Sequence, residues 1–254
     1  MRYFLHLAYN GADYSGWQIQ PTAPSVQQTL QEGLSMVLRR PVEVTGCGRT
    51  DAGVHADSYW AHVELAEAPP ARLAGRLNRI FPTGLAVRAL VPVPDDAHAR
   101  FDATYRAYRY ELTGEKDPFR PETIYHFPQL DLVDEELLRA AAALLLEFEE
   151  FAPFCKTNSD AHTMRCTLFR SEWVRTGPYR LDYHVAANRF LRGMVRLIVG
   201  MCLNVGMGKL GLASVRRSLD RQEPLARALS VPPQGLYLTE VRYPYDALLG
   251  QADG

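Results

Sequence analysis

A nine-residue segment, Gly-Arg-Thr-Asp-Ala-Gly-Val-His-Ala at 48–56, places a carboxylate and an arginine in a turn-like sequence between two strand-like runs. Gly48 and Gly53 allow backbone angles that other residues resist, so the chain is expected to turn sharply and to hold Asp51 outward. Arg49 adds a positive charge two residues away. The ordinary interpretation of a bare Thr-Asp-x-Gly sequence is a solvated hairpin turn.

A second candidate for chemistry is the alternating run at 105–112, which contains Arg106-Ala107-Tyr108-Arg109-Tyr110. An aromatic ring offers a platform for an unpaired base, and base stacking contributes about 1–3 kcal/mol. Flanking arginines suit phosphate groups. A half-buried strand with an exposed arginine face is the alternative interpretation.

Three arginines form the third candidate, because Arg189, Arg192 and Arg196 follow one another at helical spacing. The segment 190–205 is apolar nearly all round and predicts a buried helix, on which the three would share one stripe. A buried guanidinium without a partner costs several kcal/mol, so Arg196 is expected to meet a carboxylate. The residues alone leave that carboxylate open, and an acidic residue of the same domain is one alternative.

The elements that must position these residues alternate between strand and helix periods. The first part predicts a strand at 3–9, a helix starting at Ser25, strands at 42–45 and 58–65, a helix at 71–80 and a strand at 85–91. That order is close to a ferredoxin-like unit. The second part mixes helices at 134–147, 190–205 and 214–220 with strands at 163–175, 180–186 and 235–243. We therefore expect an α+β fold with two halves, 1–104 and 105–254.

Composition restricts the class of protein. The chain has 254 residues and a formal net charge of −1, so a nucleic-acid binder of this composition must segregate its charge into a basic face. No apolar run reaches membrane-spanning length, and the amino terminus runs directly into a strand pattern without a signal peptide, which makes the cytoplasm the expected location. The four cysteines are far apart and predict no zinc site.

The motifs together resemble the TruA-type tRNA pseudouridine synthases. The match is strongest at the nine residues around Asp51, at Arg106–Tyr110, which is similar to the family's Arg-x-Tyr-Arg-Tyr motif, and at Met194–Gly200, which is similar to its Met-Val-Arg helix. Further likeness lies in Gly16-Trp17-Gln18, in His98-Ala99-Arg100-Phe101 and in the closing strand at 235–243. The resemblance runs from Tyr3 to Tyr243.

This resemblance implies roles for individual residues. Asp51 corresponds to the nucleophile, Tyr108 to the tyrosine that meets the target base, and Arg196 to the ion partner of Asp51. Further substrate contacts are expected from Arg49, Thr50, Arg106, Arg189, Arg192 and Leu236. The resemblance also implies two ferredoxin-like halves whose sheets join around a cleft, a homodimer, and tRNA as the partner, with uridines 38, 39 and 40 of the anticodon arm as targets.

The reaction class explains these residue types. Pseudouridine formation breaks a C–N glycosidic bond and makes a C–C bond between the same sugar and base. An ionised carboxylate attacks C1′ of the ribose or C6 of the uracil, and a nearby arginine favours its charged form. The target base must leave its stack. No electron or group transfer occurs, so we expect no cofactor and no metal.

Three alternatives stay open. A synthase of the same family with another target uridine shares every motif. A non-catalytic RNA-binding module would keep the fold without the reaction, although intact Asp51, Tyr108 and Arg196 argue against it. A hydrolase would use Asp51 with His55, and a released base would reveal it.

Overall fold

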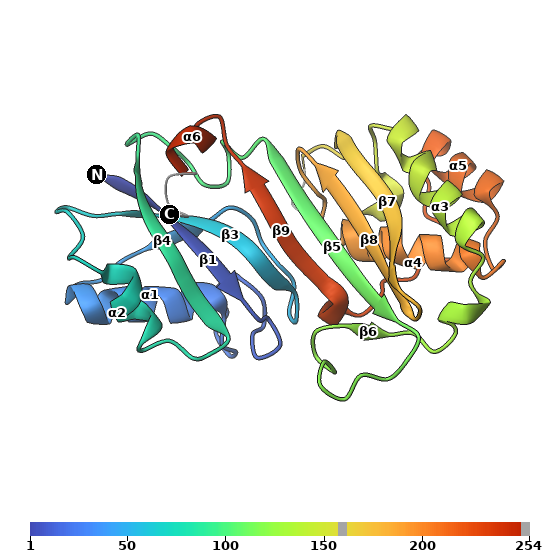
Figure 1. Ribbon diagram of the computed structural model, residues 1–254. Helices are drawn as coiled ribbons and strands as arrows, with labels where there is room; N and C mark the ends of the chain where they lie inside the picture. Colours follow the sequence, from blue (N-terminus) through green and yellow to red (C-terminus); the bar gives the residue numbers. More distant parts are fainter. Residues whose placement is uncertain (157–161, 250–254) are drawn as a thin grey trace. The chain divides into compact units, whose positions relative to one another are not determined.

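The strands and helices expected from the sequence form an α+β protein, which the computed structural model describes at residues 1–156 and 162–249 (Figure 1). Contacts divide the chain into two units. The first contains Met1–Tyr105 and the residues from Tyr237 on, and the second contains Arg106–Leu236. The division falls one residue after the boundary expected at 104, but the contacts assign the last strand to the first unit and not to the half expected at 105–254.

The first unit has the predicted order of strand, helix, strand, strand, helix, strand. Its elements are β1 (Arg2–Tyr9), α1 (Val26–Leu38), β2 (Val44–Gly46), β3 (His55–Glu64), α2 (Leu73–Asn78) and β4 (Leu85–Val93), joined by β9 (Leu236–Arg242) and the short helix α6 (Asp246–Leu249). The strands β4, β1, β3 and β2 lie next to one another in that order and pair antiparallel, which confirms the ferredoxin-like arrangement. β9 runs parallel to β3 where His55 and Ala56 pair with Tyr237 and Leu238.

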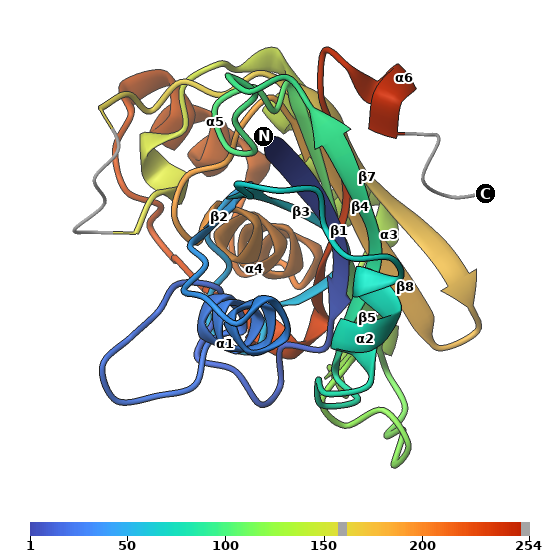
Figure 2. The same ribbon diagram turned by 90° about the vertical axis from the view of Figure 1, so that its left-hand side faces the viewer.

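Local signals explain the longest helix of this unit. Ser25 caps α1, because its hydroxyl oxygen accepts a hydrogen bond from the Gln28 backbone N–H at 3.2 Å. α1 ends at Leu38, and Arg39 takes a left-handed backbone conformation with φ 54° as its C-cap, so it lies just beyond the last turn. α2 is shorter than expected. It buries Leu73 and Leu77 and lies beside β4 (Figure 2).

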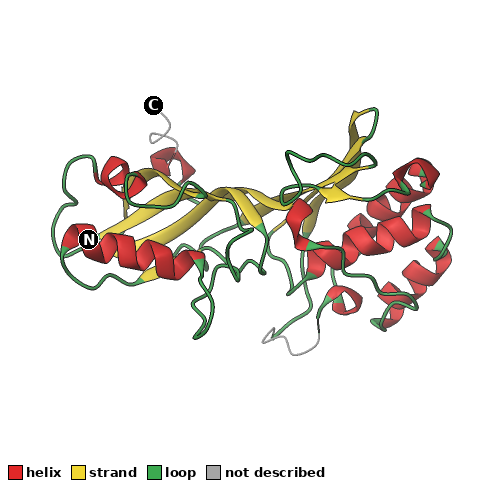
Figure 3. Ribbon diagram, turned by 90° about the horizontal axis from the view of Figure 1, so that it is seen from below, coloured by secondary structure: helices red, strands yellow, loops and turns green. Residues whose placement is uncertain are grey.

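The second unit combines an antiparallel sheet with helices on one of its faces, as Figure 3 shows. Its elements are β5 (Tyr105–Thr113), β6 (Tyr125–His126), α3 (Glu135–Leu144), β7 (Leu168–Gly177), β8 (Arg180–Ala187), α4 (Met194–Gly206) and α5 (Leu212–Arg221), with short 3₁₀ turns between them. β8 lies between β5 and β7, and β6 runs parallel to β5. α4 is buried over nearly its whole length, as its apolar sequence predicts.

Two further properties concern the described residues only. None of the helices there has the length and apolar character needed to cross a membrane. Within the same ranges, no three His, Cys, Asp or Glu side chains gather as a metal site would require.

Candidate active site

The Asp51 loop connects β2 to β3, and its backbone is tied to the long loop that follows β1. The Trp17 N–H donates to the Thr50 carbonyl at 3.2 Å, and the Gly53 N–H donates to the Tyr14 carbonyl at 3.3 Å. The Tyr9 and Thr50 hydroxyls are 3.0 Å apart. Thr50 is buried, whereas Asp51 is half-buried and Arg49 is exposed. The loop therefore holds its carboxylate at the surface on a fixed backbone.

Glycines allow the two loops to approach this closely. Gly16 has φ 102°, and a Cβ built on it would lie 2.4 Å from the Thr50 carbonyl oxygen. A Cβ on Gly11 would lie 2.0 Å from the carbonyl oxygen of Val54. Gly53 takes a positive φ of 75°, as the predicted sharp turn requires. Gly48 does not have a positive φ.

The aromatic residues of the first long loop are a buried support. The sequence left open whether they plug the core or form a base-stacking surface. Trp17 is 2% exposed and stacks on Tyr59, with ring centroids 4.2 Å apart. The Tyr59 hydroxyl donates to the Gly48 carbonyl at 2.5 Å. These rings therefore lie under the Asp51 loop and stabilise it from within the unit.

His55 is part of the same support. It is 1% exposed, its Nδ1 accepts the Gly11 N–H at 3.0 Å, and its ring stacks on Tyr237 with centroids 4.7 Å apart. An imidazole whose Nδ1 accepts a backbone hydrogen bond in the core positions the loop. This geometry disfavours the hydrolase in which His55 is the general base.

In the second unit, β5 and the end of β8 bring an aromatic pair together. Tyr108 pairs in register with Val185, and its half-buried ring meets Phe190 edge-on at 5.1 Å and 89°. Arg106 is next to this pair along the strand, and its Nη1 donates to the Asn188 carbonyl at 2.9 Å. Sequence reasoning missed Phe190 as the ring that supports Tyr108, because only the β5–β8 register places the two together.

Arg196 lies on the same side of the second unit. Its Nε donates to the Val231 carbonyl at 2.7 Å, and the Val231 N–H donates to the Arg196 carbonyl at 3.3 Å. Burial raises the pKa of Tyr110, and the positive charge of Arg196 acts against that rise, so the guanidinium lies within electrostatic reach of this tyrosine. Tyr110 follows Tyr108 by two positions on β5, so both side chains leave the strand on one face.

The predicted stripe of three arginines on one helix is wrong for two of them. α4 begins at Met194 and not at 190, because Gly193 precedes it with a left-handed φ of 71° that a helix interior does not contain. Arg189 and Arg192 therefore precede the helix. The Arg192 carbonyl accepts the Lys156 N–H at 3.0 Å. The glycine was the signal in the sequence that could have predicted this break.

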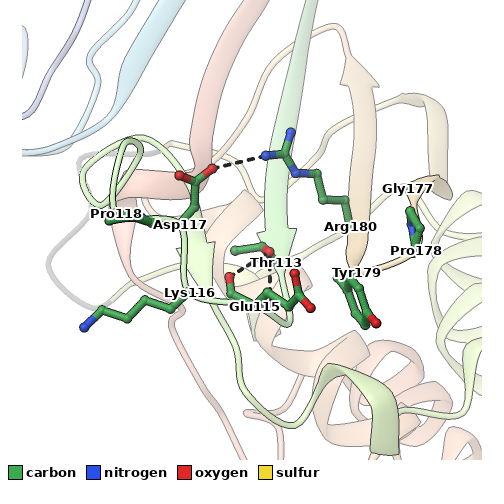
Figure 4. Close-up of a pocket in the computed structure, with 9 residues that line it drawn as sticks. All are labelled: Thr113, Glu115, Lys116, Asp117, Pro118, Gly177, Pro178, Tyr179 and Arg180. Carbon is green, nitrogen blue, oxygen red and sulfur yellow. Dashed lines mark hydrogen bonds and ion pairs between the residues drawn. The ribbon is translucent and has the colours of Figure 1, made fainter.

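One cavity in the second unit contains none of the predicted site residues. It measures about 230 Å³ and lies at the Thr113 end of β5, lined by Glu115, Lys116, Asp117 and the turn before Arg180 (Figure 4). Asp117 and Arg180 form an ion pair at 3.2 Å across it. Its lining carries balanced charge, with Glu115 and Asp117 against Lys116 and Arg180, and includes Tyr179.

Leu236 opens β9 and is 5% exposed, so this predicted contact residue is a core side chain of the second unit. The predicted residues thus form two sets. Arg49, Thr50 and Asp51 belong to the first unit, and Arg106, Tyr108, Arg189, Arg192, Arg196 and Leu236 belong to the second.

Comparison with known proteins relates both sets to one family. A family model described as tRNA pseudouridine synthase matches residues 141–244. The tRNA pseudouridine synthase A of Porphyromonas gingivalis is 44% identical over 98% of this chain and 99% of its own. The protein of the same name from Parabacteroides distasonis is 41% identical over 96% of each chain. The chain belongs to the tRNA pseudouridine synthase A family.

Membership in the tRNA pseudouridine synthase A family extends over both units. A more distant relative of that name, from a Geobacter strain, is 36% identical over 94% of this chain and 98% of its own. The family model covers β8, α4 and Arg196, but Asp51 and Tyr108 lie before its first matched residue. The relatives that match nearly the whole chain are therefore the ones that include the Asp51 loop and the Tyr108 strand.

Proposed function

We propose that this chain isomerises uridine to pseudouridine in tRNA, at positions 38, 39 and 40 of the anticodon arm, with Asp51 as the nucleophile. The names of its relatives support the reaction and the tRNA substrate. The observation that carries the proposal is the construction of the Asp51 loop. Buried rings and glycine contacts fix its backbone, while the carboxylate stays half-buried at the surface.

In the proposed reaction, the Asp51 carboxylate attacks C1′ of the ribose or C6 of the uracil. The glycosidic C1′–N1 bond breaks and C1′ bonds to C5 of the same base. The bond to Asp51 then breaks, and the proton lost from C5 is balanced by a proton gained at N1. Arg196 supplies the positive charge that favours the ionised carboxylate. Its Nε bond to Val231 fixes the direction of the guanidinium plane. No atom leaves the substrate, so the chemistry balances without a co-reactant.

Tyr108 holds the detached uracil by stacking, and its hydroxyl takes part in removal of the C5 proton. The edge-on contact with Phe190 supports this role, because it fixes the ring while leaving the side chain half-buried. Arg49, Arg106, Arg189 and Arg192 contact the phosphates around the target nucleotide. Thr50 and Leu236 act as positioning residues, since both side chains are buried.

The proposal includes a homodimer that works in the cytoplasm on folded tRNA. A base reaches the Asp51 carboxylate only after it leaves its stack, which is how enzymes that act on bases reach their target. The form of the RNA and its backbone supply most of the recognition.

The test is to incubate the purified protein with unmodified tRNA transcripts and to map pseudouridine at single-nucleotide resolution. Pseudouridine at positions 38–40 supports the proposal. The control is the same incubation without the protein. Pseudouridine elsewhere would identify a synthase of the same family with another target. Released uracil would indicate the hydrolase, and binding without any product would indicate an RNA-binding module.

A further inference from the structure

An unusual concentration of positive charge lies in the first unit, away from the Asp51 loop in sequence. Between Glu67 and Asp95 the chain contains four arginines and no acidic residue, although its formal net charge is −1. The arginines are Arg72, Arg76, Arg79 and Arg88. This segment forms α2 and β4, so the charge is segregated onto one pair of neighbouring elements.

Three of these arginines lie in or next to α2. Arg76 is in the helix, Arg72 is its N-cap and Arg79 is its C-cap. Arg76 and Arg79 are three residues apart, the spacing of neighbours on a helix surface. All three are exposed, whereas Leu73 and Leu77 are buried. We call Arg72, Arg76 and Arg79 the α2 arginine stripe.

The helix that carries the stripe is fixed to the sheet. The Asn78 side-chain amide donates to the Val87 carbonyl and accepts the Val87 N–H, both at 2.8 Å. Arg88 follows directly on β4 and is exposed as well. The stripe is therefore presented by a rigid element that lies beside β4 (Figure 2).

The stripe has no counter-charge within the described part of the chain. No ion pair there involves Arg72, Arg76, Arg79 or Arg88. In the second unit, Arg139, Arg170 and Arg180 each pair with a carboxylate, whereas Arg217, Arg221 and Arg227 form no ion pair among the described residues. What distinguishes the α2–β4 segment is that its four exposed arginines have no acidic residue among them in the sequence.

The stripe also works against the stability of its own helix. Like charges one turn apart destabilise a helix. Positive charge at the amino end opposes the helix dipole. Arg72, the N-cap, has a left-handed φ of 58°, a backbone conformation that is unfavourable for a residue with a Cβ. Folding alone therefore gives no reason for three arginines at these positions.

We propose that the α2 arginine stripe binds the phosphate backbone of the tRNA substrate, outside the contacts made around the target nucleotide. Guanidinium groups meet phosphate oxygens through two parallel hydrogen bonds. From Arg72 to Arg79 the stripe spans about 10 Å, enough for more than one phosphate of a strand. It reads no base, so it contributes affinity and orientation. The proposal rests on tRNA being the substrate.

The experiment compares two triple variants of the full chain. The first changes the stripe, with Arg72→Gln, Arg76→Gln and Arg79→Gln. The control changes Arg217→Gln, Arg221→Gln and Arg227→Gln, which are exposed arginines of the second unit without an ion pair among the described residues. Both variants lose three positive charges. Binding of unmodified tRNA transcripts is measured over a series of salt concentrations.

The stripe variant should bind tRNA at least about tenfold more weakly in 50 mM salt. The negative slope of log association constant against log salt concentration should be less steep by roughly 2–3. Its kcat should match wild type, because only uniform binding is lost. The control variant should retain the wild-type slope. Equal losses in both variants would overturn the proposal in favour of a general charge effect, as would an unchanged stripe variant.

Two more measurements keep the outcome clear. Thermal unfolding of the stripe variant should match or exceed wild type, because like-charge repulsion is relieved. A lysine version, with Arg72→Lys, Arg76→Lys and Arg79→Lys, should recover most of the salt slope. A wild type that binds tRNA through the stripe but forms no pseudouridine would refute the proposed function alone. A wild type that forms pseudouridine while both stripe variants bind normally would refute the stripe alone.

Discussion

The Asp51 loop of the first unit and the Tyr108 strand of the second are positioned by different kinds of contact. The loop has no ladder of its own, and its backbone depends on Gly16 and Trp17, more than thirty residues earlier in the chain. Tyr108 is fixed by the β5–β8 ladder and by the Phe190 ring. A loop held by close backbone approach tolerates no added atom, whereas a strand tolerates changes that keep its hydrogen bonds.

The largest effect is expected from Asp51→Asn, which removes the charge and keeps the shape. The variant should fold and bind tRNA like wild type, because the loop is held by its backbone, and it should form no detectable pseudouridine. Pseudouridine mapping after incubation with tRNA transcripts measures this. Asp13→Asn, an exposed carboxylate in the neighbouring loop, is the control. Substantial turnover by purified Asp51→Asn would remove the nucleophile assignment.

Tyr108 separates the roles of its ring and its hydroxyl. Tyr108→Phe keeps the ring that stacks and should bind tRNA almost normally, but it should turn over about 10²–10⁴-fold more slowly because the proton-transferring group is lost. Tyr108→Ala should also lose about 1–3 kcal/mol of base stacking. Single-turnover rates and tRNA affinities measure the two effects. Near-native rates in both variants would exclude Tyr108 from the site.

Substitutions of Arg196 test the contribution of α4, a helix of the second unit. Arg196→Ala removes the hydrogen bond from the guanidinium to the Val231 carbonyl, so it should lower the free energy of unfolding by about 1.5–3 kcal/mol. Loss of the positive charge proposed to act on Asp51 should lower activity as well. Arg196→Lys keeps the charge but loses the planar fork, so it should restore stability better than activity. Denaturant unfolding and turnover rates measure this. Equal recovery of both would contradict the role given to the guanidinium.

Glycine substitutions compare the two regions most directly and have the smallest expected effects. Gly16→Ala should destabilise the protein by about 1–3 kcal/mol and slow turnover, because its Cβ meets the Thr50 carbonyl at a positive φ. Gly193→Ala in the second unit meets the same strain of a positive φ, but it should cost less because its Cβ meets only the flexible Lys156 side chain.

Gly75→Ala is the control for both glycine variants. A Cβ there has nothing within 4 Å, so it should stabilise α2 by about 0.5–1 kcal/mol. Thermal unfolding of the three variants gives the comparison. A loss from Gly193→Ala that equals or exceeds that from Gly16→Ala would show that the loop is not the more constrained region.

The sequence by itself determined the elements whose signals are local. Alternation predicted β1 and β5, and Ser25 predicted the start of α1, because strand pattern and helix capping depend on residues a few positions apart. The motif around Asp51 was equally local. The existence of three chemical candidates could therefore be read from the chain before any contact was known.

Only the tertiary structure decided what those elements meet. It placed Trp17 in the core, assigned His55 to the support of the loop, and brought Phe190 against Tyr108. It also started the predicted arginine helix at Met194, after Gly193, and not at residue 190. These outcomes depend on residues that are distant in the chain or on one backbone angle. Periodicity carries no information about either, because every distant partner is compatible with the same local pattern.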